Sequence, residues 1–77
     1  MNAIQVLDMV VLLCGLPEFG LQAGDIGAVV HCYTDGKGLE VEFVTGSGET
    51  VAVTTLPRSE VRLMKEREIL HARELAA

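Results

Sequence analysis

Aromatic residues are scarce in this sequence, and no long hydrophobic run is present. Tryptophan is absent, and Phe19, Tyr33 and Phe43 are the only aromatic residues among 77. A core built from this chain must be aliphatic, and a chain this short is expected to form one domain around a single core. The longest apolar run, residues 9–14, is far below the roughly 18 residues of a membrane-spanning helix. The sequence therefore predicts a small domain with no membrane span and little room for a catalytic cleft.

Positive charge is nearly absent from residues 1–57, which contain seven acidic residues and Lys37 alone. Residues 58–77 contain five basic and four acidic residues, and the formal net charge of the whole chain is −5. Proteins bind a phosphate backbone through lysine and arginine, so this balance disfavours nucleic acid as a partner. It favours a basic protein partner, because complementary charge speeds the encounter of two proteins and rejects wrong partners.

Cysteine and histidine are also rare, with two residues of each. The first residues lack the basic segment of a signal peptide, which predicts a cytoplasmic location and, for Cys14 and Cys32, reduced thiols buried in the core. His31 and Cys32 are adjacent, so on a strand they point to opposite faces and cannot share a metal ion or act as base and nucleophile. We therefore expect no metal, no cofactor and no enzymatic activity.

Five segments have the pattern of β-strands and are separated by turns that are mostly rich in glycine. They are residues 4–14, 26–33, 39–44, 50–55 and 61–63. The third is the clearest, because Leu39, Val41 and Phe43 alternate with Glu40 and Glu42, which places the two carboxylates on a solvent-facing side. A short helix is the competing interpretation of the first segment, although its valines favour a strand. The sequence of residues 58–60 predicts a single helical turn.

Two glycines bracket Asp25 where the second strand begins. Gly24 permits a sharp turn, and Gly27 permits a kink or a bulge as the chain enters the strand. Strict alternation from there predicts two faces. One face would hold Ile26, Ala28, Val30 and Cys32, and the other would hold Val29, His31 and Tyr33.

Residues 64–77 consist of good helix formers without glycine or proline, which predicts a C-terminal α-helix. Ile69, Ala72 and Leu75 or Ala76 would lie on one stripe of this helix, with Leu70 beside it. A helix of about 14 residues is marginal in isolation, so it would pack on its own barrel or on another chain, forming a homo-oligomer in the second case. The expected organisation is a β-barrel over residues 1–63 and a helical tail over residues 64–77.

Four short motifs occur in order within residues 4–63. They are Leu16-Pro17-Glu18 followed by Gly24-Asp25-Ile26-Gly27, then Glu40-Val41-Glu42-Phe43, then Thr55-Leu56-Pro57. Together they resemble a bacterial family known as domain of unknown function 4926. The resemblance implies a five-stranded SH3-like barrel, sometimes encoded beside another small protein as a pair, and it implies no catalytic residues. The segment around Asp25 is also similar to KOW-type domains and to the barrel of nitrile hydratase subunits.

We therefore expect an all-β protein, a five-stranded SH3-like barrel with a C-terminal α-helix, that acts as a non-enzymatic protein-interaction module. A narrower hypothesis is the neutralising half of a two-protein pair, as in an antitoxin or immunity protein. The alternatives are an accessory or maturation subunit of an enzyme such as a nitrile hydratase-like system, and a KOW-like domain that contacts RNA. The predicted partner-binding residues are Glu40, Glu42 and Glu49 in an acidic patch, and Ile69, Leu70, Ala72 and Leu75 on the helix.

Overall fold

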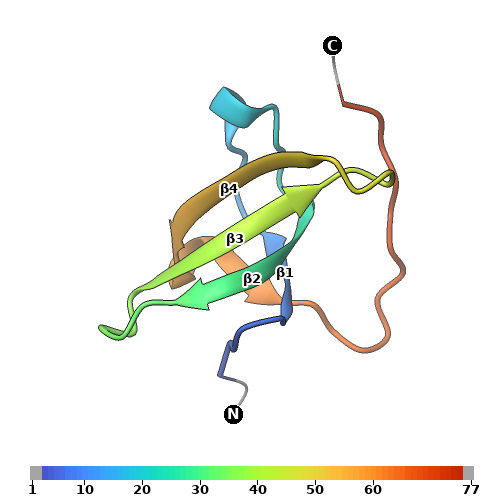
Figure 1. The fold of residues 1–77 in the computed structure, drawn as a ribbon. Coiled ribbons are helices and arrows are strands. Elements are labelled where there is room, and N and C mark those ends of the chain that lie inside the picture. Colours follow the sequence, from blue (N-terminus) through green and yellow to red (C-terminus); the bar gives the residue numbers. More distant parts are fainter. Residues whose placement is uncertain (1–2, 76–77) are drawn as a thin grey trace.

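The computed structural model describes residues 3–75, which form one antiparallel sheet of five strands and two 3-10 helices (Figure 1). The strands are β1 (Met9–Leu12), β2 (Ile26–Cys32), β3 (Gly38–Val44), β4 (Thr50–Pro57) and β5 (Val61–Leu63). The 3-10 helices are η1 (Pro17–Phe19) and η2 (Arg58–Glu60). The order of the strands in the sheet is β4-β3-β2-β1-β5. The predictions of an all-β protein and of a helical turn at residues 58–60 are confirmed.

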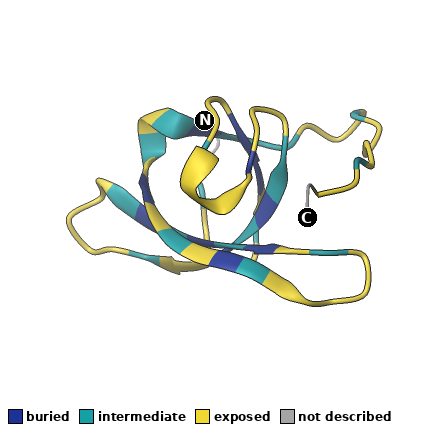
Figure 2. Cartoon of the chain, turned by 90° about the horizontal axis from the view of Figure 1, so that it is seen from above, coloured by how far each residue is buried: buried dark blue, intermediate teal, exposed yellow. Residues whose placement is uncertain are grey.

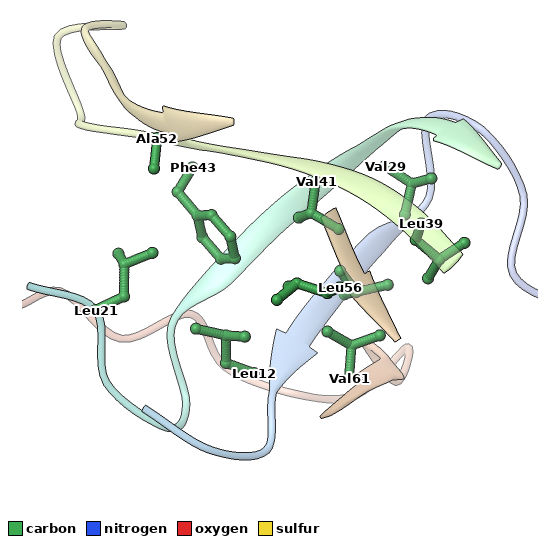
Figure 3. Close-up of a cluster of buried hydrophobic side chains, with 10 residues drawn as sticks. Leu12, Leu21, Val29, Leu39, Val41, Phe43, Ala52, Leu56 and Val61 are labelled. Atoms are coloured by element: carbon green, nitrogen blue, oxygen red, sulfur yellow. The ribbon is translucent and has the colours of Figure 1, made fainter. Parts of the chain in front are cut away.

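The sheet curls around its buried side chains, and the loop that contains η1 lies over one end of the curl (Figure 2). The core is aliphatic except for Phe43, as the composition predicts, and its side chains come from every strand (Figure 3). The buried cluster consists of Val10, Leu12, Leu21, Val29, Leu39, Val41, Phe43, Ala52, Leu56 and Val61. No helix within the described residues is long and apolar enough to cross a membrane.

Strand β3 follows the alternation of its sequence. Leu39, Val41 and Phe43 are buried in the core, whereas Glu40 and Glu42 are only half-buried and face outward. Apolar side chains on one side of a strand bury readily against the core, while carboxylates remain solvated on the other side. The predicted orientation of the two glutamates is confirmed.

Strand β1 is shorter than the predicted segment of residues 4–14. The chain turns just before the strand, where Leu7 has a φ of 77° and the N–H of Asp8 donates to the carbonyl of Gln5 at 3.0 Å. The Asp8 carboxylate accepts the N–H of Gln5 at 2.8 Å and closes this turn. The strand itself lies between β2 and β5, so Val10 and Val11, which point to opposite faces, are both buried.

Strand β2 begins after a turn in which Gly24 has a φ of 96°, as its glycine predicts. Gly27 pairs regularly with β1, and the irregularity lies instead between Val29 and His31. A bulge inserts one residue and shifts the alternation. Val29 and Cys32 therefore both pair with buried residues of β3, and the single face predicted for residues 26, 28, 30 and 32 is wrong beyond the bulge.

The two cysteines are free, but they do not occupy the predicted core positions. Cys14 is exposed just beyond the end of β1, because the chain leaves the sheet at Leu12. Cys32 is half-buried, and its Sγ lies 3.7 Å from the carbonyl oxygen of Ile4. The prediction of burial is therefore wrong for Cys14 and only partly met for Cys32.

Residues 64–75, called the tail below, contain no helix, which corrects the predicted C-terminal α-helix and the helical tail. The tail runs in an irregular path beside the sheet (Figure 1) and is held by the ion pairs Arg62–Glu68 and Arg73–Asp25. A helix this short forms only if an apolar face is packed, and Ile69 is instead 93% exposed. The last two residues of the predicted helix, 76–77, lie outside the described residues.

Candidate protein-interaction surfaces

The outward-facing side chains of β2, β3 and β4 form one continuous surface, called the outer face below. The strand register places Glu40 between His31 and Thr55, and Glu42 between Ala28 and Val53. Directly opposite residues of antiparallel strands point to the same side of a sheet. The outer face consists of Ala28, His31, Tyr33, Glu40, Glu42, Val44, Thr50, Val53 and Thr55.

Hydroxyl groups from neighbouring segments hold the two glutamates in place. The Tyr33 hydroxyl donates to Glu40 Oε1 at 2.6 Å, and the Thr55 hydroxyl donates to the same oxygen at 3.2 Å. The Thr50 hydroxyl donates to Glu42 Oε2 at 2.8 Å. Within residues 3–75 the second oxygen of each carboxylate accepts no hydrogen bond from a side chain. Each glutamate is thus fixed by its neighbours while retaining an oxygen that can accept a further donor.

No cation of the described chain neutralises these carboxylates. The two ion pairs among residues 3–75 join Arg62 to Glu68 and Arg73 to Asp25, away from the outer face. Glu40 and Glu42 have no lysine or arginine nitrogen within 4.0 Å. The outer face therefore presents two uncompensated carboxylates on a rigid sheet.

Glu49, the third predicted acidic residue, lies in the turn between β3 and β4 rather than on a strand. Its N–H donates to the Thr45 hydroxyl at 3.1 Å, and its carbonyl accepts the Thr45 N–H at 2.8 Å. Because Thr50 follows directly and contacts Glu42, the turn extends the outer face at one end. The structure thus brings Glu40 and Glu42 together and places Glu49 at the border of the same surface.

An aromatic pair accompanies Glu40 on the outer face, and sequence reasoning did not assign it to a site. The rings of His31 and Tyr33 meet edge to face, with centroids 4.7 Å apart and an interplanar angle of 84°. The signal in the sequence is their spacing of two residues, which the strand prediction already placed on one face. Their position beside Glu40 depends on the register between β2 and β3.

The first ion pair of the tail is centred on Glu68. Arg62 donates to both Glu68 oxygens, at 2.8 and 2.6 Å, and the N–H of Lys65 donates at 2.5 Å. The hydrogen bonds from Arg62, followed by the one from the Lys65 backbone, lower the pKa of Glu68 to about 2. The start of the tail is thus fastened to β5.

The second ion pair joins the tail to the turn before β2. Arg73 Nε donates to Asp25 Oδ1 at 2.9 Å, and Arg73 Nη2 donates to the carbonyl of Gly20 at 3.0 Å. The hydrogen bonds from Arg73 lower the pKa of Asp25 below its ordinary value, although partial burial opposes the shift. The tail is therefore fastened at two points, one at each end of residues 69–72.

Residues 69–72, called the strap below, span the interval between these two fastenings. Ile69 is 93% and Leu70 66% exposed, and Ala72 is exposed as well. Leu75 is exposed beyond Arg73. The predicted helical contact residues are therefore not on one helical stripe but on an extended, solvent-facing segment.

Replacing Arg73 with alanine should release residues 69–75 and leave the sheet folded, because the tail loses its fastening to Asp25. The pair is only partly buried, and ion pairs near a protein surface contribute about 1 kcal/mol or less, so the midpoint of unfolding should move little. Heteronuclear NOE values of the tail amides should fall. The matched change of Arg67, a tail residue without an ion pair in the described chain, should leave those values unchanged. Unaltered tail amides in the Arg73 variant would show that the ion pair does not hold the tail.

Low pH should also break the ion pair between Arg73 and Asp25. A depressed pKa means that Asp25 binds Arg73 as a carboxylate, so the contribution is complete above the ordinary aspartate pKa of about 3.9. It is lost as the pH falls through the lower pKa of the folded state. Tail NOE values measured across this range should decrease in the wild type. The Arg73→Ala variant should lack the Asp25 transition and keep only the later one of Glu68, whose pKa is about 2.

No three side chains of histidine, cysteine, aspartate or glutamate among residues 3–75 are placed to hold a metal ion. No charged or polar side chain of these residues is fully buried. The outer face and the strap are therefore the candidate sites, and both are surfaces rather than cavities.

Comparison with known proteins identifies the family of the chain. No curated protein and no solved structure matches it, so the SH3-like assignment stays a prediction. One family model matches residues 6–63, which include all five strands and end at the last residue of β5. The matched residues make up well over half of the chain and contain the four motifs noted in the sequence. The chain therefore belongs to the family described as Domain of unknown function (DUF4926).

Proposed function

We propose that this protein binds a basic protein partner through its outer face and has no catalytic role of its own. The observation that carries this proposal is the pair Glu40 and Glu42, which hydroxyl donors fix and which no cation among residues 3–75 neutralises. Side chains that are already ordered lose little conformational entropy on binding. The free oxygen of each carboxylate accepts a lysine or arginine donor, and hydrogen bonds between charged groups are the stronger kind.

The charge distribution of the chain supports the same partner. Residues 1–57 contain seven acidic residues and one lysine, and the two arginines that form ion pairs in the described chain, Arg62 of β5 and Arg73 of the tail, are already paired with Glu68 and Asp25. The negative field of the sheet is therefore not cancelled at the outer face. Such a field steers a basic protein toward this side and repels acidic competitors.

Apolar and aromatic groups complete the outer face. Val44 and Val53 are exposed beside the glutamates, at 53% and 48%, and Tyr33 is exposed next to Glu40. A shallow groove borders Tyr33 and is lined by Thr55, Leu56 and Pro57 together with the charged residues Asp35 and Lys37. Protein interfaces commonly combine tyrosine and aliphatic contacts with a few oriented polar groups. We propose that the aliphatic stem of a partner lysine or arginine lies along this groove.

The narrower form of the proposal is a neutralising protein that covers the basic surface of one dedicated partner in the cytoplasm. The strap would supply a second contact, since Ile69 and Leu70 are exposed between two fixed points. RNA is a less suitable partner, because the outer face presents carboxylates where RNA binding requires lysine and arginine. An accessory-subunit role would appear in the experiment below as capture of an enzyme.

The test uses the tagged full chain to capture proteins from an extract of the native cells at low salt. The captured partner is then titrated against the wild type, Glu40→Lys/Glu42→Lys and Glu40→Gln/Glu42→Gln. We expect charge reversal to weaken binding by more than about tenfold, which corresponds to 1.4 kcal/mol. The glutamine pair should have an intermediate effect, because the amide oxygens still accept the hydroxyl donors.

The matched control reverses two exposed glutamates away from the outer face. Glu18 lies in η1 and Glu66 in the tail, so Glu18→Lys/Glu66→Lys changes the net charge equally. This variant should retain most of the affinity. Equal weakening by both double variants would show that binding depends on the net charge and not on the outer face. An unchanged affinity for the Glu40/Glu42 variant would show that the outer face does not bind the partner.

A further inference from the structure

Strand β4 is one edge of the sheet and is the longest of the five strands. Its eight residues, Thr50–Pro57, pair with β3 on one side, and no strand of the described chain lies along the other side. The opposite edge is β5, which has three residues and contains Arg62. Unpaired backbone N–H and C=O groups along a long edge are a template for pairing with another strand.

Natural proteins protect such edges with charged residues, proline, bulges or short strands. Strand β4 contains no charged residue, and its protective features lie only at its ends. Pro57 closes one end, and the register shift at Phe43/Val44 makes Val51 a bulge near the other. Residues 52–56 therefore form a regular, uncharged and open stretch of edge.

We propose that β4 pairs antiparallel with β4 of a second copy of this chain, so that the two sheets become one continuous sheet across a two-fold axis. Two identical strands in antiparallel register present the same surface to each other, and such a contact closes after two copies. Residues of the same face lie opposite each other across the new strand pair. In a pairing of residues 52–56 centred on Thr54, the exposed Val53 of each copy would lie opposite Thr55 of the other copy and gain burial.

A contact at this edge keeps the acidic side chains of the two copies apart. Each chain has a net charge of −5, so copies repel unless the contact avoids the acidic residues. Glu40 and Glu42 lie on β3, one strand away from the edge. With about 4.8 Å between strands, the β3 strands of the two copies are roughly 14 Å apart. This separation exceeds the Debye length of about 8 Å at 0.15 M salt, so the repulsion is screened.

The edge contact differs from the self-association expected of a C-terminal helix, which is absent from the described residues. It also stands apart from the proposed binding of a basic partner. Strand pairing uses the backbone edge of β4, and the carboxylates of Glu40 and Glu42 stay exposed on the outer face of the joined sheet. Either proposal can therefore fail while the other holds.

The test measures the mass of the full chain by sedimentation over a range of concentrations, together with amide hydrogen exchange at the lowest and highest of them. We expect the mass to double with concentration and the exchange of residues 52–56 to slow in the concentrated sample. Raising the salt from about 0.01 M to 0.15 M shortens the Debye length from roughly 30 Å to 8 Å and should increase the dimer fraction.

The variant Val53→Lys places a charge beside the edge and should give a single-chain mass at concentrations where the wild type is dimeric. The matched control is Val44→Lys, which adds the same charge at a similarly exposed position on the interior strand β3 and should stay dimeric. Circular dichroism checks that both variants are folded. A single-chain mass for the wild type at every concentration would overturn the proposal. So would a dimer whose β4 amides exchange as fast as in dilute solution.

Discussion

Replacing Phe43 with alanine should lower the free energy of unfolding by about 3–5 kcal/mol, the largest effect expected of any single side chain here. Phe43 is 2% exposed, and it is the only aromatic member of the buried cluster. Its ring points into the cluster near Leu21 and Val41 (Figure 3). The deletion removes most of a large side chain from a small core, and the surrounding aliphatic residues cannot fill the space without moving the strands.

Urea unfolding measures this loss. It is followed by far-ultraviolet circular dichroism, because the chain contains no tryptophan whose fluorescence could report unfolding. The neighbouring change Val44→Ala is the control, because Val44 is 53% exposed on the opposite side of the same strand. It should stay within about 0.5 kcal/mol of the wild type. A Phe43→Ala variant as stable as this control would contradict the described core.

Replacing Gly27 with alanine should cost about 1–3 kcal/mol through overpacking. An added Cβ would lie 2.5 Å from Val41 Cγ1 and 2.8 Å from Phe43 Cε1, closer than real Cβ contacts allow. Val41 is a stiff β-branched residue, and the Phe43 ring is confined, so neither can move away easily. Glycine is therefore required at position 27 because side chains of the neighbouring strand β3 occupy the space that a Cβ would need.

The same substitution at Gly46 is the control for Gly27. Gly46 lies in the turn between β3 and β4, and an added Cβ would meet no atom within 4 Å. Its change to alanine should be neutral within about 0.5 kcal/mol. Because Gly27 and Phe43 are in contact, the cost of Gly27→Ala should shrink in a Phe43→Leu background, where part of the ring is missing. Equal costs for Gly27→Ala and Gly46→Ala would show that the close packing is wrong.

The sequence predicts those parts of the fold in which local pattern and burial agree. The alternation around Glu40 and Glu42 gives the orientation of β3, since a shift by one residue would bury both carboxylates. The glycine at position 24 marks the turn before β2, and its positive φ is observed. In both places the decisive information lies within a few neighbouring residues.

The tail shows where local propensity fails. Residues 64–77 favour a helix by composition, yet Arg73 is bound to Asp25, which lies 48 residues earlier in the chain. Arg62 and Glu68 form a second contact that a continuous helix would not place at the same geometry. Tertiary contacts of this kind determine whether a marginal helix forms, and no local sequence pattern predicts them.

The charged residues of the candidate site could be predicted from the sequence, but the hydroxyl groups that hold them could not. The outward direction of Glu40 and Glu42 follows from alternation, whereas their hydroxyl donors depend on register. Tyr33 reaches Glu40 only because a bulge before His31 resets the alternation of β2. That bulge has no marker in the sequence, since the glycine expected to form it, Gly27, serves close packing instead.

The position of β1 between β2 and β5 sets an order of events during synthesis. Strands β2, β3 and β4 follow one another in the chain and pair as neighbours, so their contacts are local and form early. Strand β1 is made first, but its pairing with β5 must await residues 61–63. Until then its apolar residues Val10 and Leu12 are incompletely covered, and a nascent chain in this state is open to aggregation or to capture by a chaperone. The sheet is therefore complete only after residues 61–63 have been added.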